Sequence, residues 1–335
     1  MEWTFQKLSK PAICKLRKFA ILSVKHHLLK RLRILTLFCT VIAVAFRRAG
    51  DFDEISDARK KVTESEQTMN YMKITSSLNA KIKAAYEIKQ RKSSSEHSFF
   101  LIEGPHLIEM ALGSDIPIRE VFFTESFSRK KEGRRVLEQL SRHTGKLYEV
   151  SDSAYHKLTG TETPQGIIAV ATHRKLSLKE LPLSSNPLLV VSDSIQDPGN
   201  LGTIIRTADA VGADAVIILP GTCDVYMQKT VRATAGSLFN IPIVHATVDE
   251  FSDWLRAHKI LLAVSTVDSE KSFFEADLIG PVAIVFGNEA HGVHKEFMIA
   301  ADMALNIPIY GKAESLNVAT SAAVCLYEAV RQRRR

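Results

Sequence analysis

Residues 188–219, LLVVSDSIQDPGNLGTIIRTADAVGADAVIIL, decide the fold of this chain. The stretch begins with an apolar run at residues 188–192, which is typical of a strand buried on both faces. A cluster of turn-forming residues follows at 197–200. From Thr203 onwards the apolar side chains take helical spacing, so the sequence predicts a strand, a tight turn and an amphipathic helix in succession.

The predicted helix has a clear end, and a second strand follows it. Gly212 is a good C-terminal stop, and residues 215–219 form another apolar run. Such a strand–helix–strand unit places its turn at the carboxyl edge of a parallel sheet, where α/β proteins bind their ligands. Asn200 and Arg206 lie on this turn and on the first helical stretch. Because Arg206 lies in an otherwise apolar segment, we expect it to have a partner, most naturally an anion.

The composition is that of an ordinary globular protein with room for two domains, but its charge is unevenly distributed. The 335 residues are 45% hydrophobic and 24% charged, with a net charge of +7. Residues 1–50 hold eleven Lys or Arg and one acid, Glu2, which gives +10, whereas the remainder holds 33 basic and 36 acidic residues. The basic excess is therefore not evidence that the folded part binds RNA. Residues 331–335 form one local basic tip.

The N-terminal residues have the character of a targeting segment. Residues 1–50 are basic and almost free of acids, and the uncharged run at residues 34–46 is short for a membrane span. We interpret residues 1–50 as a transit peptide for a chloroplast or mitochondrion, with a signal anchor or a wrongly defined start as alternatives. If the segment is not a transit peptide, we expect a cytoplasmic protein. Residues 51–75 are interpreted as a linker.

The four cysteines of the chain show no paired spacing, and two of them lie in the N-terminal segment. Neither a disulfide framework nor a zinc site is indicated, which fits a reducing compartment.

Residues 76–172 predict a small α/β domain in which strands and helices alternate. The expected strands are residues 99–102, 121–123, 147–150 and 165–170, and the expected helices are residues 79–90, a segment ending at Met110, and residues 134–142. Residues 173–187 contain Leu-Pro and Asn-Pro steps and are expected to be a linker into the second domain.

The alternation continues beyond Leu219. The expected strands are residues 243–244, 260–265, 283–286 and 304–309, and the expected helices are residues 225–238, 251–258 and 318–331. We therefore assign the whole chain to the α/β class.

Three polar, glycine-bearing turns follow three of these strands: DPGNLGTIIRT at residues 197–207, FGNEAHG at residues 286–292 and IPIYGKAESLN at residues 307–317. Taken one at a time, their residues have ordinary interpretations. Asn200 can be a simple turn residue, and Glu289 a charge at a helix N-terminus. Residues 315 and 317 can be helix caps.

Together and in this order, the three turns resemble the SpoU/TrmH group of SPOUT ribose methyltransferases over residues 187–331. Residues 76–172, with IEGPHLIE and TETPQGI, resemble the small RNA substrate-binding domain of that group. The resemblance implies a SPOUT-type parallel sheet with a C-terminal trefoil knot, an exception to the rule against threaded chains. It also implies S-adenosyl-L-methionine as cofactor and a homodimer whose subunits share each active site.

The resemblance also assigns roles residue by residue. The catalytic and RNA-contacting positions fall on Asn200, Arg206, Glu289, Ser315 and Asn317. The positions where the family's backbone holds the adenine and ribose of the cofactor fall on Gly287, Ile307 and Leu316. The chain departs from the family pattern at Ala319, where a hydroxyl residue is common, and at DPGN, which replaces a DPHN-like turn.

Methylation of a ribose requires what these turns offer. A 2′-hydroxyl is a poor nucleophile until its proton is removed or its oxyanion is stabilised. Because arginine is too basic to be an ordinary general base, we expect Arg206 to clamp the adjacent phosphate and stabilise the developing charge. Asn200, with the residues at 315 and 317, would orient the ribose and that arginine, and Glu289 would fix the local network.

Two other interpretations of these turns are less favoured. His291 and His294 could join Glu289 in a metal site, but such residues are more often solvated or hydrogen-bonded, so we expect no metal. GNLG does not match the GxGxxG of dinucleotide-binding folds.

The leading hypothesis is S-adenosylmethionine-dependent 2′-O-ribose methylation of RNA, with organellar rRNA as substrate and no stable membrane association. A tRNA methyltransferase and a catalytically silent RNA-binding assembly factor are the alternatives.

Overall fold

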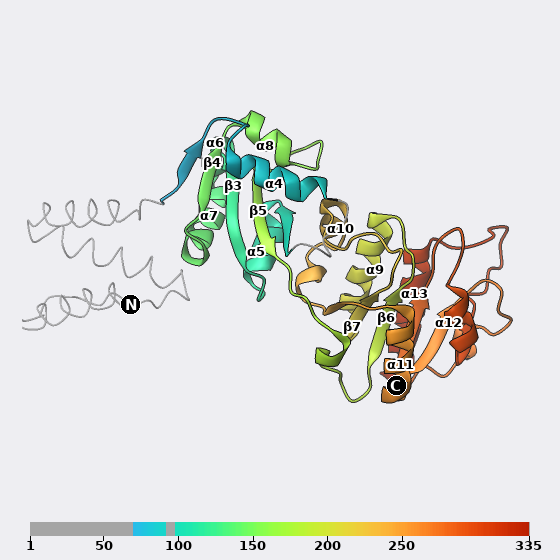
Figure 1. Cartoon of the computed structure of the whole chain (residues 1–335). Helices are drawn as coiled ribbons and strands as arrows, with labels where there is room; N and C mark the ends of the chain where they lie inside the picture. Colours follow the sequence, from blue (N-terminus) through green and yellow to red (C-terminus); the bar gives the residue numbers. More distant parts are fainter. Residues whose placement is uncertain (1–69, 92–97, 335) are drawn as a thin grey trace, which may run out of the picture. The chain divides into compact units, whose positions relative to one another are not determined.

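The computed structural model describes residues 70–91 and 98–334 (Figure 1). Residues 69–335 form one unit by their internal contacts. The proposed transit peptide and most of the expected linker at residues 51–75 lie outside the described residues. No helix in the described part of the chain is long and apolar enough to cross a membrane. Cys223 and Cys325 are both free thiols.

The N-terminal domain is built on a five-stranded mixed sheet. Its strands, in spatial order, are β1 (Met72–Ile74), β4 (Leu147–Val150), β3 (Ile118–Thr124), β5 (Ile167–Thr172) and β2 (Phe99–Glu103). Strands β1, β4 and β3 run parallel, and β5 is antiparallel to both of its neighbours. The helices are α4 (Ala80–Gln90), α5 (Pro105–Leu112), α6 (Glu125–Ser128), α7 (Lys131–His143) and α8 (Asp152–Leu158). The buried residues of α4 and α8 join one hydrophobic core, and those of α5 and α7 join another.

The structure corrects the start of this domain. The expected linker extends too far, because Met72–Ile74 is strand β1 and pairs with β4 at the edge of the sheet. The strand has three residues, of which only Ile74 is buried. It is therefore too short for an alternation of apolar and polar residues to be recognised in the sequence. Helix α8 was also not predicted; its cap is Ser151, whose hydroxyl accepts a hydrogen bond from the backbone of Ala154.

The C-terminal domain contains six strands, all parallel, which confirms the predicted parallel sheet. In spatial order they are β11 (Met303–Leu305), β9 (Leu261–Ser265), β10 (Val282–Phe286), β6 (Leu188–Ser192), β7 (Ala215–Ile218) and β8 (Ile243–His245). Every residue of β6 and β10 is buried, which explains their uninterrupted apolar runs. From β6 the chain proceeds outward through β7 and β8, then returns so that β10 lies on the other side of β6. The carboxyl ends of β6 and β10 therefore border the switch in strand order where such sheets bind ligands.

Helices cover both faces of this sheet. They are α9 (Pro198–Val211), α10 (Gln228–Ala233), α11 (Val248–His258), α12 (Lys295–Ala300) and α13 (Val318–Arg333). The buried residues of α9 and α13 join one core, and those of α11 and α12 join another. Three 3₁₀ helices, η1 (Leu178–Glu180), η2 (Ser237–Phe239) and η3 (Phe273–Glu275), complete the described elements.

Two expected elements of this domain are shorter than predicted. The helix expected at residues 225–238 is only α10, because the chain leaves helical geometry at Ala235 and Gly236, both at positive φ. The last strand ends at Leu305 rather than at residue 309, because the chain makes only an isolated bridge at Asn306 and Pro308 follows. The trefoil knot implied by the resemblance stays a prediction.

Candidate active site

Helix α9 presents its first turn at the carboxyl edge of the sheet. It begins at Pro198, earlier than the apolar spacing predicts, because Asp197 is its N-cap and accepts the backbone N–H of Asn200 at 2.9 Å. The helix ends as predicted at Gly212, whose φ of 71° is left-handed. Asn200 is therefore a first-turn residue with a fixed backbone, and its side chain is available for other contacts.

Three of the five expected catalytic residues are joined by hydrogen bonds. The side-chain amide of Asn200 donates to Oε1 of Glu289 at 2.6 Å. The side-chain amide of Asn317 donates to Oδ1 of Asn200 at 3.1 Å. The three residues come from the three separate turns that the sequence singled out. We call this set the Asn317–Asn200–Glu289 network.

Asn317 also serves as the N-cap of α13. Its Oδ1 accepts the backbone N–H groups of Ala319 and Thr320 at 2.9 and 3.3 Å. The capping interpretation and the active-site interpretation of this residue are thus both satisfied by one side chain. Ser315, two residues earlier, is exposed and makes no hydrogen bond or ion pair with the described residues, so the structure does not bring it into the network.

Glu289 is held on a tight turn. Asn288 and Gly292 exchange two backbone hydrogen bonds of 2.9 Å, and the Asn288 side chain donates to the backbone oxygen of Ser194 at 2.8 Å. A Cβ on Gly287 would lie 2.4 Å from the backbone of Gly292, so only glycine permits this close approach. Asn288 was not identified from the sequence. Its neighbours in the FGNEAHG turn were the only available signal.

The same turn is fastened to β6 by a buried carboxylate. Asp193 has a fully buried side chain and accepts the backbone N–H of His294 at 2.7 Å, and it also bonds Nδ1 of the same residue. His294 is therefore hydrogen-bonded, as one of the sequence interpretations expected. No group of three His, Cys, Asp or Glu side chains among the described residues could hold a metal ion. Asp193 was missed, although an acid directly after a buried strand was a usable signal.

Arg206 lies away from the apolar residues that surround it in the sequence. The apolar side of α9 consists of Leu201, Ile204, Ile205, Ala208 and Val211, all buried. Arg206 lies on the opposite side, is exposed, and has no hydrogen bond or ion pair with any described residue. Asp209, the acid on the same helix, accepts a bond from Asn240 at 3.4 Å. The guanidinium is thus available to an external anion.

The three positions assigned to the cofactor offer unused backbone groups. Gly287 follows β10, Ile307 follows β11, and Leu316 precedes the cap of α13. Within the described residues, none of their backbone N–H or C=O groups makes a hydrogen bond. The Ile307 side chain packs partly buried against the core, while Leu316 is 39% exposed. Free donors and acceptors beside apolar side chains fit the adenine and ribose of S-adenosylmethionine.

Comparisons with known proteins agree with this geometry. Residues 187–327 match the model of the SpoU rRNA Methylase family, and residues 79–169 match the MRM3-like substrate binding domain. A 23S rRNA (guanosine(2553)-2′-O)-methyltransferase of Bacillus subtilis is 36% identical over 255 residues, covering 76% of this chain and 97% of the relative. A 23S rRNA (uridine(2479)-2′-O)-methyltransferase of Streptomyces viridochromogenes is 32% identical, covering 70% and 83%.

Solved structures extend the similarity to the fold. An AdoMet-bound rRNA methyltransferase from Sinorhizobium meliloti has a TM-score of 0.71 and 31% identity, covering 78% of this chain and 98% of that one. The SpoU methyltransferase AviRb from Streptomyces viridochromogenes in complex with AdoMet also has a TM-score of 0.71, with 30% identity and coverage of 76% and 98%. The similarity therefore extends over both domains, and the chain belongs to the SpoU rRNA methylase family, whose members use S-adenosylmethionine.

Proposed function

We propose that this protein is an RNA 2′-O-ribose methyltransferase that acts on rRNA. The observation that carries the proposal is the Asn317–Asn200–Glu289 network, which joins the three motif turns at one edge of a parallel sheet. Support for rRNA comes from the Bacillus subtilis relative, a 23S rRNA methyltransferase 97% covered by this chain, and from the substrate-binding domain match at residues 79–169.

The network suits the handling of a ribose hydroxyl. The cofactor supplies a methyl group activated by the sulfonium to which it is bonded. Asn200 uses one side-chain donor for Glu289 and accepts one bond from Asn317, which leaves its second amide hydrogen and a second lone pair for the ribose. Because its neighbours fix the amide plane, Asn200 can hold the 2′-oxygen in line without reorganising.

Arg206 provides the positive charge for this chemistry. Its exposed guanidinium has no partner among the described residues, so it can bind the phosphate next to the target ribose with two parallel hydrogen bonds. The same charge stabilises the oxyanion that develops as the hydroxyl loses its proton. Ser315 would act in the presence of RNA, since it is exposed and unbonded in the chain alone.

The activity is tested with the full-length protein, labelled S-adenosylmethionine and an unmodified rRNA transcript. We expect label in the rRNA, and none once the mapped nucleotide is replaced by its 2′-deoxy form. Transfer to tRNA alone would favour the tRNA alternative. Cofactor and RNA binding without any transfer would favour the silent assembly factor, against which the presence of all five expected catalytic residues already argues.

We further propose that the substrate is organellar rRNA. The support is the charge of residues 1–50, +10 with Glu2 as the only acid, which is typical of a transit peptide. A fluorescent reporter fused to residues 1–70 should accumulate in chloroplasts or mitochondria. A diffuse cytoplasmic signal would contradict this localisation.

A homodimer, which the resemblance implies, remains part of the proposal, but the small-residue face of the last helix does not supply the interface. The small-residue face of α13, including Ala322 and Ala329, is buried in the chain's own core, where α13 packs against α9. Support now comes from large apolar side chains that stay exposed, such as Ile299 at 86% and Tyr310 at 94%. Sedimentation of an active monomer at micromolar concentration would contradict the dimer.

A further inference from the structure

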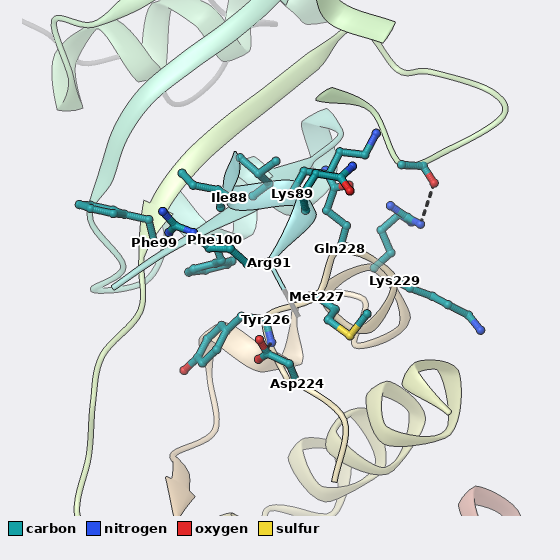
Figure 2. Close-up of a pocket in the computed structure, with 14 residues that line it drawn as sticks. Ile88, Lys89, Arg91, Phe99, Phe100, Asp224, Tyr226, Met227, Gln228 and Lys229 are labelled. Atoms are coloured by element: carbon teal, nitrogen blue, oxygen red, sulfur yellow. Dashed lines mark hydrogen bonds between the residues drawn. The ribbon is translucent and has the colours of Figure 1, made fainter. Parts of the chain in front are cut away.

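A cavity of about 230 Å³ lies where the N-terminal domain meets α10 (Figure 2). One side is formed by the end of α4 and the start of β2, and the other by residues 224–232. None of the expected catalytic or cofactor residues lines this cavity. It is therefore distinct from the Asn317–Asn200–Glu289 network and has no role in the chemistry described above.

Basic side chains predominate around the cavity. The charged lining residues are Lys89, Arg91, Lys229, Arg232 and a single acid, Asp224. This balance favours an anionic occupant.

Two of the cations, Lys89 and Arg232, are hydrogen-bonded to other parts of the protein. The ammonium of Lys89 donates to the backbone oxygen of Lys157 at 2.9 Å. The guanidinium of Arg232 donates to the backbone oxygen of Gly160 at 3.1 Å and lies 3.4 Å from the buried Glu103. The Arg232 contacts hold the two sides of the cavity together, because they tie α10 to the N-terminal domain.

Of the other two cations, Arg91 is free and Lys229 forms an ion pair at the surface. Arg91 has no hydrogen bond or ion pair with any described residue. Lys229 is 61% exposed and pairs with Asp197 at 2.9 Å. Figure 2 shows Arg91 and Lys229 on opposite sides of the cavity. Since Asp197 is also the N-cap of α9, Lys229 connects the cavity with the turn that carries Asn200.

Large apolar side chains are exposed at the same place. Phe99 is 40% exposed and Met227 is 37% exposed, and both line the cavity. Tyr226 is held in place by stacking on His173, with ring centroids 4.4 Å apart. Exposed aromatic and apolar surface beside a free cation, here Arg91, is the combination with which proteins bind unpaired nucleotides, because bases stack on the rings and a phosphate binds the charge.

We propose that this cavity binds an unstacked nucleotide of the RNA substrate near the methylated one, with its base against Phe99 and its phosphate held by Arg91. The inference rests on the proposed function, which supplies a single strand of RNA at the neighbouring turn. Binding at two places on one strand would let the N-terminal domain contribute to the choice of target.

The test measures the affinity of the full-length protein for a fluorescein-labelled rRNA fragment, without methylation. We expect Phe99→Ala to weaken binding about tenfold, the scale of losing one base–aromatic stack, and Phe99→Tyr to bind normally. Tyr86→Ala is the matched control, since Tyr86 is also 40% exposed and belongs to α4 but does not line the cavity. Equal affinities for the two alanine variants would overturn the proposal.

A second arm tests the phosphate contact. The measured quantity is the slope of the logarithm of RNA affinity against the logarithm of salt concentration. Arg91→Gln should make this slope shallower by about one. Arg142→Gln, on helix α7 and not among the residues that line the cavity, should leave it unchanged. An unaltered salt dependence in Arg91→Gln would exclude the assigned contact.

A third arm changes the RNA, and its main comparison uses the unaltered protein. Abasic nucleotides are introduced one at a time around the methylated position. We expect one abasic RNA to bind about tenfold more weakly, and Phe99→Ala to have no further effect on that RNA. If no abasic position reproduces the loss, the proposal is wrong.

Further measurements separate this inference from its alternatives. Melting temperature and S-adenosylmethionine affinity should be unchanged in Phe99→Ala, which a merely structural role would not allow. If the protein binds free GMP tightly and Phe99→Ala leaves the RNA affinity unchanged, the cavity binds a free nucleotide and not the RNA. If no RNA is methylated but Phe99→Ala still weakens RNA binding, the proposed activity fails and the cavity assignment stands.

Discussion

The side-chain amide of Asn317 donates a hydrogen bond of 3.1 Å to the side-chain oxygen of Asn200, 117 residues earlier in the chain. The oxygen of the same Asn317 side chain caps helix α13. One side chain therefore uses its acceptor for the fold and its donor for the candidate site. The two uses can be separated by substitution because they involve different atoms.

Asn317→Asp keeps the capping oxygen but removes the donor to Asn200. We expect the free energy of unfolding to stay within about 0.5 kcal/mol of the native value, since aspartate is as good an N-cap as asparagine. Methyl transfer in a single turnover should fall about tenfold or more, because Asn200 loses one of its two fixing bonds. Urea unfolding and rapid-quench methylation on the same sample check both parts.

Asn317→Ala is the matched control because it removes both atoms. It should lose similar activity and, in addition, about 1 kcal/mol of stability from the lost cap. An Asp variant with normal turnover would show that the bond to Asn200 has no catalytic consequence.

Arg206→Ala should separate catalysis from stability. Because the side chain is exposed and unpaired in the described structure, we expect a change in unfolding free energy within about 0.5 kcal/mol. Turnover should fall about 10²-fold, the scale of losing one preorganised oxyanion contact. Lysine should restore little, since it lacks the planar pair of donors. Arg256→Ala, on α11, is the control and should methylate normally; equal turnover in the two variants would refute the assignment.

The surroundings of Arg206 illustrate what the sequence could and could not reveal. The apolar positions of α9 predict a helix correctly, and Gly212 marks its end. Advancing about 100° per residue, Arg206 falls opposite the apolar side, so its exposure was implicit in the pattern. The expectation that Arg206 needs a partner arose from reading apolar neighbours in sequence as neighbours in space.

Other features had no pattern to reveal them. Strand β1 is three residues long and is stabilised by a partner strand more than 70 residues away. The bond between Asp193 and His294 joins positions 101 residues apart, and no spacing rule connects them. Buried runs such as β6 and β10 were found because each is long enough to be recognised alone. The resemblance predicted that the three turns share one site, and only the structure shows the contacts between them.

The cap of α9 should give a pH-dependent contribution to stability. The Lys229 ammonium, followed by the backbone N–H of Asn200, lowers the pKa of the Asp197 carboxyl below its ordinary value. A lowered pKa in the folded state means that the contribution is complete above the unfolded-state pKa of about 3.9. It is lost as the pH falls through the lower folded-state value.

Asp197→Asn keeps a capping oxygen but loses the charge, so it isolates this contribution. The native protein should be the more stable of the two near pH 7, by no more than about 1 kcal/mol because the pair is exposed. The difference should shrink to zero as the pH falls below about 4. Urea unfolding at a series of pH values measures it. A difference that persists unchanged in acid would mean that the ion pair is not its source.

Residues 1–68 should be dispensable for folding and for methylation, because residues 69–335 form one compact unit that contains both matched domains. A chain that begins at Met69 should match the full-length protein in melting temperature and in turnover on an rRNA transcript. Starting at Met72 would already remove Tyr71, whose ring packs edge-on against Phe123 at 5.4 Å.

A chain that begins at Ser76 is the informative comparison. It lacks β1, so β4 loses its neighbour, Ile74 no longer fills the core, and Ser151 loses its 2.9 Å bond to the backbone of Thr75. Losing the buried isoleucine alone should cost about 1.5–3 kcal/mol, so this chain should melt clearly below the one that begins at Met69. Equal melting temperatures for the two chains would mean that β1 adds nothing to the fold. A Met69 chain that bound cofactor and RNA but transferred no methyl group would instead place a catalytic requirement within residues 1–68.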